Sequence, residues 1–277
     1  MLITHKSQGF QKNILFNLLK ELGFSDIESF QSKYGLAVDG VFGMKSYEKL
    51  YNLLLNPEKI PFEGFYFKQV FPKKQIIWHH SAGWDNARGM FDWWRTDKLF
   101  HVATAIGISD NGKVSQGFDE QYWAASIGCK NNVFSANGVP FIYRNGIISN
   151  NQMLDEQAVA VEICNWGSLS KQGDKFFSWS GAEVARERVI ELDYKGYKFF
   201  EIYTDSEIKS LKYWSLLNGM RFEIPLNYSY NDMFTVSKNA LSGKSGLYTH
   251  NSYRFDKNDV APQPKLMDMA TKLQEYM

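Results

Sequence analysis

The chain has 277 residues, of which 44% are hydrophobic and 22% are charged, and its formal net charge is +1. This length allows one large domain and a smaller one. The near-neutral charge gives no electrostatic basis for binding nucleic acid or an anionic membrane, and no run approaches the roughly 18 apolar residues of a membrane span. Two cysteines, Cys129 and Cys164, give no disulfide framework and fit a reducing compartment.

Residues 10–55 have the apolar spacing of three short helices. The first covers 10–22 and ends before a glycine; the second begins near Asp26 and ends at Gly35; the third starts at about Met44 and ends before a proline. A unit of this size has a thin core, so we expect it to pack against its neighbour.

Residues 57–74 contain three prolines and a lysine pair, which indicate a linker that partly packs on the larger domain. From residue 75 onward, short apolar strands alternate irregularly with helices. Strands are expected at 76–78, 103–108, 159–164 and 198–203. The sequence therefore predicts an α/β fold, in which a mixed central sheet is flanked by helices and preceded by a small three-helix domain.

Two helices of the larger domain have clear start signals. The sequence Thr-Asp-Ser-Glu at 204–207 is a capping box, and the helix that it opens is expected to stop at Asn218-Gly219. Pro264 begins a last helix, because proline is favoured in the first helical turn.

Histidines and a carboxylate suggest a metal site. His79 ends an apolar strand, and His250 and Asp259 lie in a polar stretch with no apolar period. Imidazole and carboxylate groups are suitable zinc ligands, although spacing alone leaves open that His79 is an ordinary core or surface residue. His80 is the alternative ligand, but neighbours on a strand point to opposite faces. The remaining histidines, at 5 and 101, have no partner signal, and we interpret them as structural or solvated.

Four motifs follow one another along residues 75–275. Residues 76–82 read Ile-Ile-Trp-His-His-Ser-Ala, residues 110–114 read Asp-Asn-Gly-Lys-Val, residues 159–162 read Val-Ala-Val-Glu, and residues 250–262 hold His…Lys-Asn-Asp followed by proline. In this order they resemble the zinc-dependent N-acetylmuramoyl-L-alanine amidases, the family that includes phage lysins and animal peptidoglycan-recognition proteins.

The resemblance implies a mechanism. Zn2+ would be held by His79, His250 and Asp259, and zinc-activated water would cleave the amide bond between N-acetylmuramic acid and L-alanine. Glu162 would be the general base, and Lys257 would stabilise the oxyanion. The alternatives are a Glu162 that faces water from an edge strand and a Lys257 that is merely a solvated loop residue.

Some residues near these motifs are candidates for substrate contacts, and others depart from the family pattern. Asn165, Trp166 and Arg254 flank the motifs and are predicted to touch sugar or stem peptide. Thr104 and Ser126 stand where many relatives carry tyrosine and histidine. These departures put substrate contacts and rate in doubt, but not the fold.

The N-terminal segment carries a second resemblance. Residues 30–43 read Phe-Gln-x-x-Tyr-Gly-Leu-x-Val-Asp-Gly-Val-Phe-Gly, which is similar to the core of three-helix peptidoglycan-binding domains. Asp39 and the glycines would shape the turn, whereas Val41 and Phe42 would pack it. The predicted domains are therefore 1–56 for wall binding, 57–74 as linker and 75–277 as the zinc amidase.

The leading hypothesis is a phage endolysin whose partner is peptidoglycan, with no nucleic-acid or membrane partner and a monomer as the simplest state. The N-terminal residues lack signal-peptide order, so we expect the protein to stay in the cytoplasm of the producing cell until its release to the cell wall. The rival hypotheses are an inactive recognition protein, a cytoplasmic muropeptide-recycling amidase, and a virion-associated or secreted effector amidase.

Overall fold

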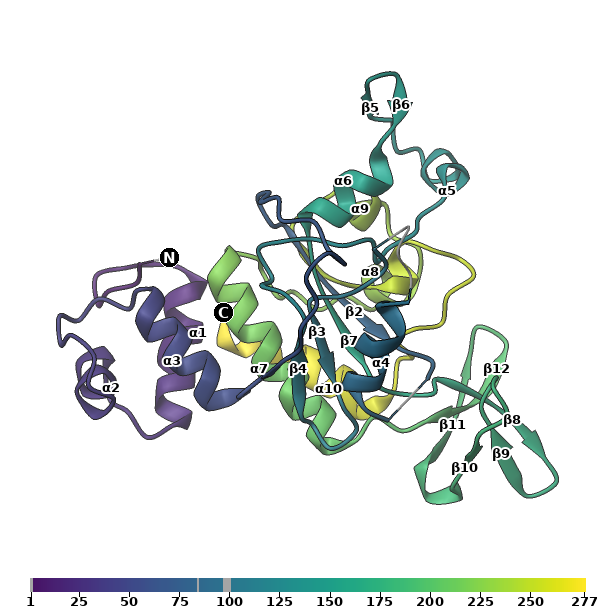
Figure 1. Cartoon of the computed structure of the whole chain (residues 1–277), viewed down its shortest axis with the longest axis horizontal. Coiled ribbons are helices and arrows are strands. Elements are labelled where there is room, and N and C mark those ends of the chain that lie inside the picture. Colours follow the sequence, from purple (N-terminus) through teal and green to yellow (C-terminus); the bar gives the residue numbers. More distant parts are fainter. Residues whose placement is uncertain (1, 84, 97–100) are drawn as a thin grey trace.

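A mixed six-stranded sheet forms the centre of the molecule (Figure 1). The computed structural model describes residues 2–83, 85–96 and 101–277. The strands lie in the order β1-β4-β3-β7-β2-β13. Their bounds are β1 Glu58–Lys59, β2 Gln75–His80, β3 Ile106–Ile108, β4 Val114–Gln116, β7 Ala158–Ile163 and β13 Gly246–Thr249. Only the β3–β4 pair is antiparallel; β1–β4, β3–β7, β7–β2 and β2–β13 are parallel.

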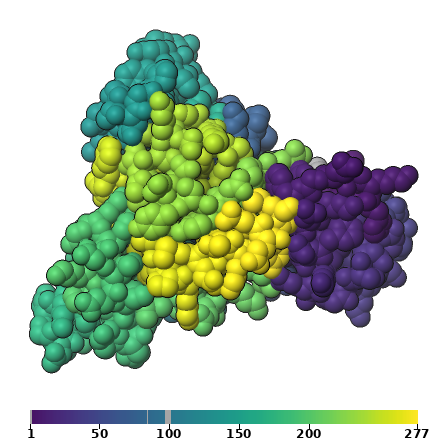
Figure 2. All heavy atoms as spheres, turned by 180° about the vertical axis from the view of Figure 1, so that it is seen from behind, coloured from purple at the N-terminus to yellow at the C-terminus, as the bar shows by residue number. Residues whose placement is uncertain are grey.

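Helices cover both faces of this sheet. The helix α4 (Ala87–Trp94) packs on β3 and β4 in front of the sheet in Figure 1. The helices α7 (Asp205–Phe222) and α10 (Pro264–Leu273) pack on each other behind it, and Figure 2 shows them from that side. The predicted fold class, a mixed sheet flanked by helices, is confirmed. None of the described helices has the length and apolarity needed to cross a membrane.

Short elements complete the larger fold. They are α5 (Asn131–Ala136), β5 (Tyr143–Arg144), β6 (Ile147–Ile148), α6 (Asn150–Gln157), α8 (Tyr230–Phe234), α9 (Lys238–Leu241), and the 3-10 turns η1 (Arg186–Arg188), η2 (His250–Ser252) and η3 (Gln274–Tyr276). The β5–β6 hairpin projects from the top of Figure 1, beyond α6.

The three expected N-terminal helices are present as α1 (Phe10–Glu21), α2 (Ile27–Lys33) and α3 (Met44–Leu54). The buried Gln31 side chain fixes the turn between α2 and α3: its amide donates to Asp39 Oδ1 at 2.8 Å and its oxygen accepts from the Gly40 N–H at 3.1 Å. As expected, the N-terminal helices pack against the larger fold. Their apolar residues share one continuous core with α7 and the C-terminal helices.

The predicted linker is built into the larger fold. It begins with β1, which pairs with β4 as an edge strand of the central sheet. Phe62 is buried, and the buried Lys73 ammonium donates to the carbonyls of Tyr122 and Glu156. The packing is more extensive than the expected partial contact, whereas the division of the chain into functional domains stays a prediction.

Two predicted boundaries were wrong. The helix α7 continues past Asn218-Gly219 to Phe222. The Asn218 amide donates to the Trp214 carbonyl inside the helix, and a Cβ at Gly219 would lie 3.1 Å from the Ile224 carbonyl oxygen, so the glycine permits close packing instead of ending the helix. The strand expected at 103–108 is reduced to β3, because the Thr104 hydroxyl donates to the carbonyl of Ile106 and Ala103 pairs with Ala125.

A second, antiparallel sheet projects at the lower right of Figure 1. We call residues 168–201 the small sheet. Its strands, in the order β10-β9-β8-β12-β11, are β8 Ser168–Gln172, β9 Lys175–Phe177, β10 Glu183–Val184, β11 Val189–Tyr194 and β12 Tyr197–Glu201. It has a core of its own, formed by Leu169, Phe176, Val184 and Val189. The sequence indicated only β12 of these strands.

Candidate metal centre

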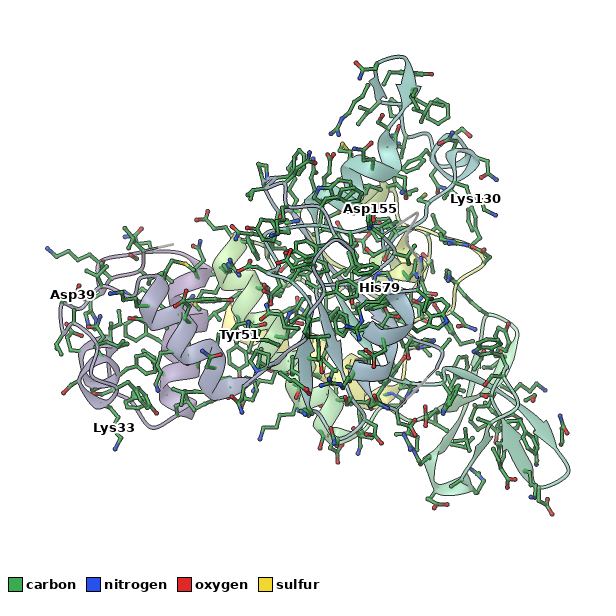
Figure 3. The ribbon with its side chains drawn as sticks, viewed as in Figure 1. Lys33, Asp39, Tyr51, His79, Lys130 and Asp155 are labelled. Carbon is green, nitrogen blue, oxygen red and sulfur yellow. The ribbon has the colours of Figure 1, made fainter. Side chains whose placement is uncertain are left out.

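The strand order brings the predicted metal ligands together. β2 and β13 are parallel neighbours, and Trp78 is in register with Thr249. The next residues, His79 and His250, therefore lie at the same end of the sheet, because parallel strands share their carboxyl edge. The chain then returns through a loop that places Asp259 beside both rings. His79 lies near the middle of the molecule in Figure 3.

The three side chains form a compact, buried cluster. Asp259 Oδ2 lies 2.9 Å from His250 Nδ1 and 3.6 Å from His79 Nδ1. The two imidazole centroids are 4.6 Å apart. One potential ligand atom from each residue lies within 4.8 Å of the others, and within the described ranges no other group of three such side chains is so placed.

The cluster fits a zinc ion. The Nδ1 atoms of His79 and His250 both face Asp259 Oδ2, at 3.6 and 2.9 Å, so three suitable ligand atoms converge on one place. His250 Nε2 lies 2.8 Å from the Ile127 carbonyl oxygen; this contact fixes the ring and leaves Nδ1 for a metal, as is usual for ligating histidines. Two imidazoles and a carboxylate form the donor set of many catalytic zinc sites.

Electrostatics favour the metal-binding protonation states of His79 and Asp259. Burial and the neighbouring His250 lower the pKa of His79 to about 4, against the pull of Asp259, so its imidazole is neutral at pH 7. Burial alone would raise the pKa of Asp259, but the charge and hydrogen bond of His250, together with His79, hold that pKa well below its usual range.

The His80 ring is fixed by packing between Tyr203 and Gly167, which indicates a structural role. Its Nδ1 lies 2.7 Å from the Tyr203 hydroxyl. A Cβ at Gly167 would lie 2.4 Å from His80 Nε2, so the glycine makes room for this ring. The ring borders the same cleft as His79, but its nitrogens face these neighbours, and the metal cluster is formed with His79.

A cleft of about 460 Å³ opens over the cluster. Glu162 on β7 is in register with His79 on β2, so the two side chains share a face of the sheet. β7 is an inner strand and Glu162 lines the cleft, so this carboxylate is not an edge-strand group in bulk water. Burial and Asp259 raise its pKa well above the usual range, whereas Lys257 lowers it. Lys257 is half-buried and lines the same cleft.

The predicted substrate contacts lie outside the lining of this cleft. Asn165 is buried, and its side chain donates to the Ile202 carbonyl and accepts from the Gly167 N–H. Trp166 packs on the core of the small sheet. Arg254 pairs with Asp256 at 2.7 Å. These contacts are structural, and a role in substrate binding stays a prediction for all three residues.

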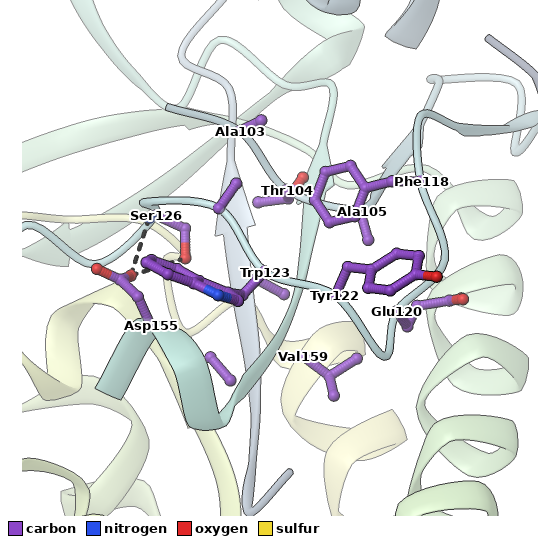
Figure 4. A pocket seen from close by; sticks show the side chains of 13 residues that line it. Ala103, Thr104, Ala105, Phe118, Glu120, Tyr122, Trp123, Ser126, Asp155 and Val159 are labelled. Carbon is purple, nitrogen blue, oxygen red and sulfur yellow. Dashed lines mark hydrogen bonds between the residues drawn. The ribbon is translucent and has the colours of Figure 1, made fainter. Parts of the chain in front are cut away.

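Thr104 and Ser126 line both the cleft and a small neighbouring cavity, which Figure 4 shows. This cavity has about 10 Å³, room for about one water molecule. Asp155 borders it and accepts from the N–H groups of Ser126 at 2.9 Å and Ile127 at 3.0 Å. Because the Ile127 carbonyl contacts His250, Asp155 helps to position that ligand. Burial raises the pKa of Asp155 to about 7.

Sequence reasoning missed two aromatic cleft residues of the small sheet, Trp179 and Tyr197. Both are exposed aromatic side chains in a segment without a clear apolar period, and nothing in their local sequence sets them apart from loop residues. Only the fold shows that they border the metal cluster.

No family model matches the chain, and no curated protein matches its sequence. Among solved structures it is similar to PlyL, with 13% identity, a TM-score of 0.44 and coverage of 79% of this chain and 96% of that one. It is also similar to the N-acetylmuramoyl-L-alanine amidase LysC from Clostridium intestinale, with 11% identity, a TM-score of 0.39 and coverage of 78% of this chain and 95% of that one. A third similar structure is the ligand-bound Staphylococcus aureus hydrolase AmiA, with 10% identity, a TM-score of 0.41 and coverage of 83% of this chain and 90% of that one. Similarity at this level carries no argument about function, which must come from the site itself.

Proposed function

We propose that this protein is a zinc-dependent peptidoglycan amidase that cleaves the bond between N-acetylmuramic acid and L-alanine. The observation that supports this most strongly is the convergence of His79, His250 and Asp259 in one cleft that Glu162 and Lys257 also line. These five residues come from three separate sequence motifs, at 76–82, 159–162 and 250–262, and from both ends of the larger fold. The choice of substrate bond rests on the resemblance of these motifs to the N-acetylmuramoyl-L-alanine amidases.

The side chains suit amide hydrolysis. A bound zinc ion would supply Lewis-acid activation of water and of the scissile carbonyl. Glu162, on the sheet face of His79, would accept a proton from the attacking water and deliver it to the leaving amine. The Lys257 ammonium would stabilise the negative charge that develops on the carbonyl oxygen.

We further propose that the enzyme is an endolysin. The segment 30–43 supports a wall-binding role for the N-terminal helices, and a wall-binding unit raises the local concentration of an enzyme on an insoluble polymer. In this role the protein would wait in the cytoplasm of the producing cell and reach the wall on release.

Digestion of purified sacculi by the zinc-loaded protein tests the activity. We expect free stem peptides that begin with L-alanine, identified by mass spectrometry. Asp259→Ala should lose both stoichiometric zinc and activity, whereas Asp268→Ala, which removes an exposed ion pair with Lys272 on α10, should keep both. New reducing sugar ends would instead indicate a glycosidase. Wall binding with retained zinc but without products would indicate a recognition protein.

A further inference from the structure

The small sheet forms one wall of the cleft that holds the metal cluster. Trp179, in the connection between β9 and β10, and Tyr197, at the start of β12, both line this cleft. Their side chains are well exposed, with relative exposures of 77% for Trp179 and 46% for Tyr197. Exposed aromatic rings beside a reaction site are a frequent mark of ligand binding.

The Trp179 ring and the hairpin that carries Tyr197 are held in place by contacts to the segments that carry the predicted metal ligands. The Trp179 indole N–H donates to the carbonyl of Ala82, three residues after His79. Tyr197 follows the tip of the β11–β12 hairpin, where the Lys195 ammonium donates to Asn251 Oδ1 at 2.9 Å and to the Lys257 carbonyl at 2.5 Å. The Trp179 ring is therefore exposed but anchored, and Tyr197 projects from an anchored hairpin, so the loss of conformational entropy when a ligand covers this wall would be small.

The shape of this wall favours a sugar ring over a peptide. Tryptophan and tyrosine present a flat apolar face with a polar edge. A pyranose has a matching C–H face that is rimmed by hydroxyl groups, whereas an extended stem peptide has no flat ring to cover the aromatic faces. His79, His250 and Asp259 are buried whereas the two aromatic residues are exposed, so the amide would react inward of this wall.

We propose that Trp179 and Tyr197 form a glycan-binding wall, which holds sugar rings of the polysaccharide strand next to the scissile amide. This inference rests on the proposed function and deepens it: the small sheet recognises the glycan, while the metal cleft acts on the bond to the peptide. It gives residues 168–201 a functional role in selecting polymeric substrate.

Calorimetric titration of the full-length, zinc-loaded Glu162→Gln protein tests this wall without hydrolysis. The probe is a peptide-free tetrasaccharide of alternating N-acetylglucosamine and N-acetylmuramic acid, and the comparison probe is a free stem peptide. In this background, Trp179→Leu and Tyr197→Ala should each weaken tetrasaccharide binding by roughly three- to tenfold and leave peptide binding unchanged. The matched control is Tyr143→Ala, whose ring is 60% exposed on the distant β5–β6 hairpin; it should change neither.

The result separates this inference from the proposed function. Tetrasaccharide affinity that is unchanged in both wall variants, or a loss that is equal for peptide and tetrasaccharide, would overturn the glycan wall even if the enzyme is an active amidase. Selective loss of tetrasaccharide binding would support the wall, even if sacculi yielded no free stem peptides and the amidase assignment failed.

Discussion

Two regions are attached to the central sheet in different ways, the N-terminal helices and the small sheet. The N-terminal helices pack against α7 and the C-terminal turn η3 (Figure 1), through apolar side chains of the shared core. The small sheet has its own core and also contributes Tyr194 and Phe200 to the shared core, but of the two regions it alone lines the metal cleft, where polar contacts join it to the loop that carries Asp259. Changes in the N-terminal helices should therefore alter mainly the free energy of unfolding, whereas changes in the small sheet should alter mainly binding at the metal cleft.

A buried carboxylate lies at the junction of the N-terminal helices with the larger fold. Glu120 accepts a hydrogen bond from the Tyr51 hydroxyl of α3 at 2.5 Å and from Gln116 at 2.9 Å. Arg221 of α7 lies 3.6 Å from the same carboxylate. Tyr51 is seen at this junction in Figure 3. None of these residues lines the metal cleft, so the junction is separate from the chemistry.

The small sheet has a comparable carboxylate with different connections. Glu201 is fully buried; it accepts from the Trp166 N–H at 2.6 Å and lies 2.8 Å from Arg188 Nη2. Two hydrogen bonds join the small sheet to residues 250–262, which we call the metal loop. The Asn258 amide donates to the Ser168 hydroxyl, and the Lys195 ammonium donates to the Lys257 carbonyl. The small sheet is thus linked to the loop that carries Asp259.

The largest effect is expected at the N-terminal junction. Glu120→Ala removes the partner of the mostly buried Arg221 and of Tyr51, and breaking such a buried pair costs about 3–5 kcal/mol. The free energy of unfolding in urea should fall by this amount, while zinc affinity stays that of the unmodified protein. A parallel fall in zinc affinity, measured by competition with a chelator, would contradict the separation of the two regions.

The N-terminal helices were predicted well from sequence, because their apolar period, the Asp26 cap and the glycines are local signals. The convergence of His79, His250 and Asp259 was also predicted, since each of them lies in a recognisable motif. The small sheet was not. Its strands are two to six residues long, and its aromatic wall depends on a hydrogen bond between Trp179 and Ala82, 97 residues apart. Contacts of this range leave no periodic trace in either segment.

A pH-dependent effect is expected at the base of the small sheet. Burial raises the pKa of Glu201 to about 7, against the Trp166 N–H and Arg188. Its contribution to stability is therefore complete below its unfolded pKa of about 4.3 and is lost as the pH rises to about 7, because only the unfolded chain ionises freely in that window.

Glu201→Gln should remove this loss, since glutamine cannot ionise. The unfolding free energy of the unmodified protein should fall relative to that of the variant between about pH 4.3 and pH 7. Glu191→Gln, at an exposed position of β11 in the same sheet, is the control and should follow the unmodified protein. Identical pH profiles for all three proteins would show that Glu201 is ionised in the folded state throughout.

The smallest effect tests the link between the small sheet and the metal loop. Lys195→Ala removes the two hydrogen bonds that hold Asn251 and the Lys257 carbonyl. Outer contacts that orient metal ligands are worth about tenfold or more in metal affinity, so zinc affinity should fall about tenfold with little change in the unfolding free energy. Lys198→Ala, an exposed lysine on β12, should leave both quantities unchanged. If Lys195→Ala also retains full zinc affinity, the metal loop is positioned by β13 and Asp155 alone, and the small sheet affects only what binds beside the metal.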